Sequence, residues 1–99
     1  MISVKVDYND QKISRFVVSG HAMYETYGKD IVCSAVSSCV ITTVNAILEI
    51  APDSILVEQA KEIVIEVQKM DTIVLKLLQN MLDMLKSLEN QYPKNIKFQ

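Results

Sequence analysis

The sequence predicts an α+β fold, a mostly antiparallel sheet with two helices on one face. Segments with the two-residue period of strands come in pairs, and each pair precedes a longer segment whose apolar residues have helical spacing. A short apolar segment near the end adds one strand, which gives the order ββαββα plus a short C-terminal strand. With 99 residues, 49% of them apolar and 22% charged, the chain can build one core, and we expect a single domain over residues 1–99.

The first two strands are predicted over residues 2–8 and 12–19, joined by a polar hairpin connection. In the first strand apolar and polar residues alternate, as in a strand with one buried face. Gly20 follows the second strand and gives the chain a position where it can bend sharply. The residues of the first strand expected to face the core are Ile2, Val4, Val6 and Tyr8.

The first helix is predicted over residues 34–50. Its β-branched residues favour a strand, but the length of the segment and the spacing of its apolar residues favour a helix. Pro52 disfavours the helical conformation at Ala51 and therefore ends the helix. The residues expected to face the core are Val36, Val40, Val44, Ile47 and Ile50.

A second strand pair is predicted at residues 55–57 and 63–67. The connection contains good helix formers and no glycine, so one helix over residues 54–70 is the alternative. Asp71 is a favourable N-cap for the last helix, and Pro93 ends it. The expected apolar face of this helix comprises Val74, Leu77, Leu78, Met81, Leu82, Leu85, Leu88 and Tyr92.

Two groups of residues complete the expected fold. Ile96 and Phe98 add the short terminal strand. Met70, Met81 and Met84 stand at helical spacing and are expected to fill the core and not to line a binding groove. Because the core is modest and the sheet keeps one open face and an edge, we also expect a homodimer.

Composition excludes several classes of function. The net charge is −2 and no basic run is present, so binding to nucleic acid has little electrostatic support. No stretch approaches 18 uninterrupted apolar residues, and we expect neither export nor membrane insertion. One His and two Cys do not supply a metal site, so we expect no metal and no cofactor. Cys33 and Cys39 point apart on a helix, which disfavours a disulfide, and Cys39 is expected to pack in the core.

His21 and Cys33 form a possible catalytic pair. A side chain that takes up a proton near neutral pH lies twelve positions before one that attacks carbonyls as a thiolate. Cys33 is expected at the start of a helix, where unpaired backbone N–H groups favour a thiolate and could hold an oxyanion. Taken alone, the residues equally fit a small buried Cys33 and a hydrogen-bonded loop residue at His21.

Two motifs resemble a known family. The segments Ser19-Gly20-His21-Ala22 and Gly28 to Ser37 are similar to the signature of the bacterial ribosomal-processing cysteine proteases. The resemblance implies a small cytoplasmic endopeptidase, a homodimer, that removes the N-terminal extension of a large-subunit ribosomal protein precursor. It also implies that His21 and Cys33 are the catalytic dyad.

Further residues are assigned by the same resemblance. Asp30 and Ser37 fall on positions that support the dyad, and Ser34 stands after the nucleophile, where such proteins often have Ala. Asp30 either orients the imidazole or caps the helix. Ser37 lies one turn after Cys33, and its hydroxyl either reaches the thiol region or bonds back to the carbonyl of residue 33.

The segment between the dyad residues is expected to meet the substrate. Tyr24, Tyr27 and Gly28 lie in a loop that could close over an extended peptide, or that is a solvated connection. Two other functions remain open at this point. One is a non-catalytic interaction module in ribosome assembly, whose sheet edge pairs with a partner strand. The other is a different thiol enzyme, such as an acyltransferase.

Overall fold

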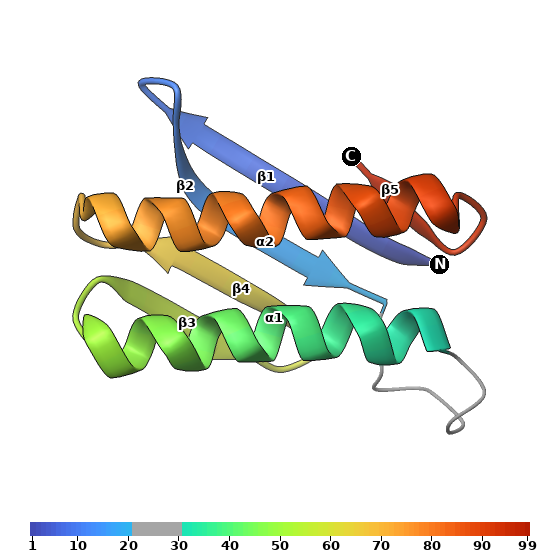
Figure 1. Ribbon diagram of the computed structural model, residues 1–99, viewed down its shortest axis with the longest axis horizontal. Coiled ribbons are helices and arrows are strands. Elements are labelled where there is room, and N and C mark those ends of the chain that lie inside the picture. The colour runs from blue at the N-terminus through green and yellow to red at the C-terminus, as the bar shows by residue number, and fades with distance from the viewer. Residues whose placement is uncertain (21–30) are drawn as a thin grey trace.

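The computed structural model describes residues 1–20 and 31–99, in which two helices cover one face of a sheet (Figure 1). The α+β class and the predicted order of elements are confirmed. Residues 54–70 do not form one helix, because a strand pair occupies most of this segment. The elements are β1 (Ile2–Asn9), β2 (Lys12–Ser19), α1 (Ile31–Ile50), β3 (Ile55–Gln59), β4 (Glu62–Val67), α2 (Thr72–Gln91) and β5 (Ile96–Phe98).

The strands form a mixed sheet in the order β3-β4-β2-β1-β5. β1 and β2 are antiparallel, as are β2 with β4 and β3 with β4, whereas β5 runs parallel to β1. Strands that are distant in sequence therefore meet in the sheet, and β5 places the end of the chain beside its beginning. Ile2, for example, pairs with Ile96.

The β1–β2 connection explains how a tight hairpin forms without glycine. Asp10 has φ 52° and Gln11 has φ 65°, the left-handed conformations that two-residue hairpin turns require. The register of the strands shifts between Asp7 and Tyr8, as at a β-bulge. Tyr8 is 54% exposed, so its expected place in the core is wrong, whereas Ile2 and Val4 are buried as predicted.

The core lies between the sheet and the two helices, which run side by side across it (Figure 1). The backbone N–H of Val74 donates to Oδ1 of Asp71 over 3.0 Å, so the predicted N-cap of α2 is confirmed. The predicted face of α2 is also confirmed, with its members buried or packed on the core. Met81 is fully buried, but Met70 and Met84 are 60% and 51% exposed, so their expected role as core filler is wrong.

Helix α1 packs on the sheet through its predicted stripe, with one exception. Val36, Val40, Val44 and Ile47 are buried, whereas Ile50 is 56% exposed. Among the described residues, α1 is also the one helix long and apolar enough to cross a membrane, with a mean hydropathy of 2.0. A helix packed against a sheet passes the same test.

Candidate active site

Cys33 lies in the first turn of α1, at the end of the sheet where β2 also ends (Figure 1). The helix begins at Ile31, three residues before its predicted start, so Cys33 is its third residue. The first backbone N–H groups of a helix have no partner within the helix and carry the positive end of its dipole. The position therefore suits a sulfur that becomes negative and an oxyanion that forms beside it.

The side chain of Cys33 is 4% exposed and belongs to the hydrophobic core cluster. It thus has the burial expected of a small structural cysteine in addition to its place at a helix start. Cys39, six residues later, is half-buried against the core, as predicted. Burial raises the pKa of the Cys39 thiol, which disfavours its thiolate. The structure has no disulfide between Cys33 and Cys39.

Ser34 and Ser37, the two candidate serines of α1, have different surroundings. Ser34 is exposed to solvent. The Oγ atom of Ser37 is buried and has no hydrogen-bond partner within residues 1–20 and 31–99. The bond from Ser37 back to the carbonyl of residue 33 is therefore not made, although Thr43 makes the equivalent bond to the carbonyl of Cys39 over 2.9 Å.

Gly20 forms the expected sharp bend at the end of β2, with φ 77°. His21, Tyr24, Tyr27, Gly28 and Asp30 lie outside the described residues. The described chain thus gives the point where this segment leaves β2 and the point where it enters α1. Within the described part of the chain, no group of three or more His, Cys, Asp or Glu side chains could hold a metal ion.

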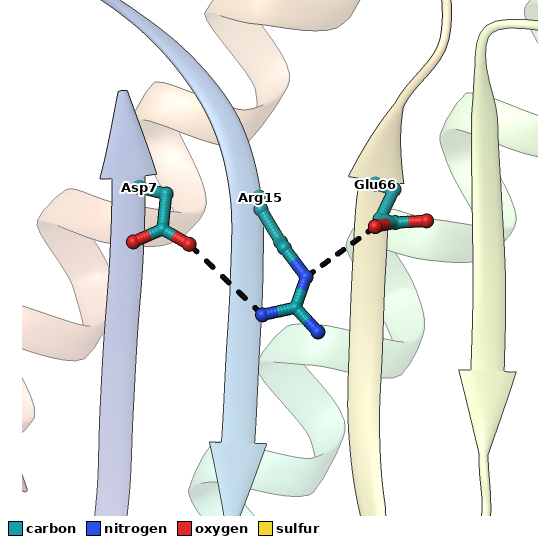
Figure 2. A network of polar contacts seen from close by, with 3 residues as sticks. All are labelled: Asp7, Arg15 and Glu66. Carbon is teal, nitrogen blue, oxygen red and sulfur yellow. Dashed lines mark ion pairs between the residues drawn. The ribbon is translucent and has the colours of Figure 1, made fainter. Parts of the chain in front are cut away.

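The face of the sheet away from the helices carries a second polar feature. Arg15 of β2 reaches Asp7 of β1 over 3.9 Å and Glu66 of β4 over 3.4 Å, and Figure 2 shows the three side chains in a row across the strands. Leu56 pairs with Glu66, lies on the same face and is 58% exposed. Ion pairs this exposed stabilise a fold by at most about 1 kcal/mol. This face is available for contact with another molecule.

Comparisons with known proteins identify a protein family and related sequences. The family model described as cysteine protease Prp matches residues 1–97. Proteins of two Staphylococcus aureus strains, each called ribosomal processing cysteine protease Prp, are 32% identical to the chain and align with 98% of it and 96% of their own length.

Solved structures show the same fold. The S. aureus essential ribosomal processing protease Prp in complex with a substrate peptide has a TM-score of 0.89 and 28% identity, over 100% of this chain and 98% of that one. The same protease with a covalently linked product peptide has a TM-score of 0.89 and 29% identity, over 99% and 97%. SMU.848 of Streptococcus mutans, at 23% identity and a TM-score of 0.88 over 100% and 92%, shares the fold.

Proposed function

Because the chain belongs to the Prp family of cysteine proteases, we propose that it removes the N-terminal extension of a large-subunit ribosomal protein precursor with a Cys33–His21 dyad. The observation that carries the dyad is the place of Cys33 in the first turn of α1, at the sheet end where β2 leads through Gly20 to His21. Membership of a protease family makes a non-catalytic module and an acyltransferase poorer descriptions of the chain.

The reaction follows from the chemistry of the two side chains. His21 accepts the proton of the Cys33 thiol, and the thiolate attacks the carbonyl carbon of the scissile peptide bond. Backbone N–H groups at the start of α1 stabilise the oxyanion, and His21 returns the proton to the leaving amine. Water then hydrolyses the thioester, with His21 as the base. The covalently linked product peptide of the S. aureus protease supports a covalent mechanism here.

Two residues support the dyad in this proposal. Ser37 supplies a hydroxyl one helical turn after Cys33, and this hydroxyl has no competing partner in the described part of α1. Asp30 directly precedes the helix, where a carboxylate caps the N-terminal N–H groups or orients an imidazole. Ser34 follows the nucleophile and is exposed to solvent, so in this proposal it can meet an approaching peptide.

The substrate is an extended peptide, bound by strand-like main-chain hydrogen bonds and apolar pockets. Tyr24 and Tyr27 are the proposed anchors for apolar side chains before the scissile bond, and Gly28 lets the loop approach the peptide. The reaction requires no cofactor, since a thiol and an imidazole supply its chemistry. The names of the S. aureus relatives, which refer to ribosomal processing and to a substrate peptide, support this choice of substrate.

A cytoplasmic location follows from this substrate, because ribosomal proteins are made and assembled there. We also propose that the enzyme is a homodimer. The uncovered sheet face and the exposed Leu56 support a second copy as the partner of this face. The low negative charge of the chain suits a basic protein substrate better than a nucleic acid.

The dyad is tested with a peptide that spans the junction between extension and mature protein. Cys33→Ala and His21→Ala should reduce turnover by at least about 1000-fold, since neither leaves a nucleophile–base pair. Cys39→Ala is the matched control, because it removes a thiol from the same helix outside the site. Circular dichroism checks that each variant is folded. An active His21→Ala protein with wild-type turnover would exclude the dyad.

A further inference from the structure

Met1 lies against the residue that joins β2 to the His21 segment. Gly20 has φ 77°, a conformation that residues with a Cβ atom rarely adopt. A Cβ atom added to Gly20 would lie 2.4 Å from the carbonyl oxygen of Met1 and 3.6 Å from the Cα of Ile2. A non-glycine residue therefore requires movement of the backbone, either of Met1 or of Gly20 itself.

The peptide unit between Met1 and Ile2 is held on the side of β1 opposite β2, where β5 lies. The N–H of Ile2 donates to the carbonyl of Asn95 over 2.8 Å, and the buried Ile2 side chain pairs with Ile96 in the parallel β1–β5 ladder. Because Ile2 is fixed by both the core and β5, the peptide unit before it has little room to move away from Gly20.

Hydrogen bonds in turn connect the β5 end of the chain to α2 and to β1. The N–H of Phe98 donates to Oε2 of Glu89 in α2 over 2.9 Å. The N–H of Gln99 donates to the carbonyl of Val4 over 2.8 Å. A Cβ at position 20 would consequently displace Gly20 more readily than Met1.

We infer that Gly20 is a positioning residue of the protease, which acts by fixing the direction in which the chain leaves β2 toward His21. The contact with the Met1 carbonyl and the positive φ together set that direction. The inference rests on the proposed function, in which His21 serves Cys33. A small error in the placement of a catalytic group can cost about 100-fold in rate.

The first test compares Gly20→Ala with Gln11→Val. Each change puts a poorly tolerated side chain at a residue with positive φ. Gly20 follows β2, whereas Gln11 precedes it in the hairpin turn and is exposed at the far end of the strand from Cys33. Both variants should melt at lower temperature than the wild type. Gly20→Ala should lose about 100-fold in kcat with KM changed less than about 3-fold, whereas Gln11→Val should keep kcat.

A second readout follows the pH dependence of Cys33 alkylation, which reports the imidazole next to the thiol. The Gly20→Ala profile should match that of His21→Ala, and the Gln11→Val profile should match the wild type. Wild-type kcat and profile in Gly20→Ala would overturn the inference, as would equal losses in Gly20→Ala and Gln11→Val. Wild-type turnover in His21→Ala would instead overturn the proposed dyad, so the two failures are distinguishable.

A double change covers the case in which Gly20→Ala does not fold. A protein that begins at Ile2 lacks the carbonyl that the new Cβ would strike, and little else is lost because the Met1 side chain is 71% exposed. Gly20→Ala in this shortened protein should fold and melt closer to its shortened parent than Gly20→Ala does to the full chain. Equal loss of melting temperature in both backgrounds would show that Met1 is not the opposing group.

Discussion

Ser37 follows Cys33 by one helical turn, and its hydroxyl is buried without a hydrogen-bond partner in the described part of the chain. Leaving such a group unpaired costs about 1–3 kcal/mol. In the same helix, Thr43 satisfies its hydroxyl through the carbonyl of Cys39. The unpaired hydroxyl therefore lies one helical turn from the proposed nucleophile, and we expect it to find its partner when the substrate is bound.

Ser37→Ala is expected to separate activity from stability. Removal of an unpaired hydroxyl should leave the free energy of unfolding unchanged or raise it by up to about 1 kcal/mol. Turnover should fall by about 10-fold if the hydroxyl serves the site. Urea unfolding and peptide cleavage measure the two quantities.

Thr43→Val provides the control for Ser37→Ala. It removes a hydroxyl that is hydrogen-bonded in α1, so it should cost about 1 kcal/mol of stability and leave turnover intact. Wild-type turnover in Ser37→Ala, combined with a loss of stability, would show that the hydroxyl serves only the fold.

Selective alkylation should identify the nucleophile. Accessibility alone favours Cys39, which is half-buried, over Cys33, which is 4% exposed. Reactivity favours Cys33, because burial raises the pKa of the Cys39 thiol and the first turn of α1 favours an anion at Cys33. We expect limited iodoacetamide at neutral pH to label Cys33 first, as measured by peptide mapping.

The denatured protein is the control for this labelling, since the two thiols should then react at similar rates. Preferential labelling of Cys39 in the native protein would contradict the assignment of Cys33 as the nucleophile.

The arrangement of elements was predictable because apolar periodicity is a local property. The N-cap at Asp71 and the apolar face of α2 were visible in the sequence and are present in the structure. The exact first residue of α1 was not, because Ile31, Val32 and Cys33 carry no strong signal for the start of a helix. Tyr8 was misplaced because alternation predicts the side of the sheet but not the depth of burial: Tyr8 pairs with the buried Ile13, yet it lies at the end of β1 beside the hairpin turn and is 54% exposed.

The candidate site was predictable in part. The motif residues place Cys33 at a helix start, and the structure agrees. The contact between Gly20 and Met1 follows from the antiparallel pairing of β1 with β2, in which Ser3 pairs with Ser19. It was not predictable from alternation, because the register shift between Asp7 and Tyr8 changes which residues of the two strands lie opposite each other. Met84 was wrongly assigned to the core because helical spacing does not define the edges of the buried face of α2. Met84 lies outside that face.

A homodimer through the open sheet face should be sensitive to charge at Leu56. Leu56→Asp places a carboxylate near Glu66 on that face, so like charges and lost apolar contact should both weaken association. We expect dissociation to monomers in sedimentation velocity at micromolar protein, with the monomer still folded.

Met84→Asp is the matched control for Leu56→Asp, since Met84 is similarly exposed but lies on α2, away from the open sheet face. It should leave the dimer intact. A monomeric wild-type protein, or dissociation by Met84→Asp alone, would contradict a dimer through the sheet face.

Cleavage of the full-length ribosomal protein precursor tests the proposed function most directly. Purified precursor is incubated with wild-type, Cys33→Ala or Cys39→Ala protein, and intact masses are measured over time. We predict that the wild type and Cys39→Ala cut once, releasing the N-terminal extension, and that Cys33→Ala leaves the precursor whole. An uncut precursor with the wild type, or equal cutting by Cys33→Ala, would contradict the proposal.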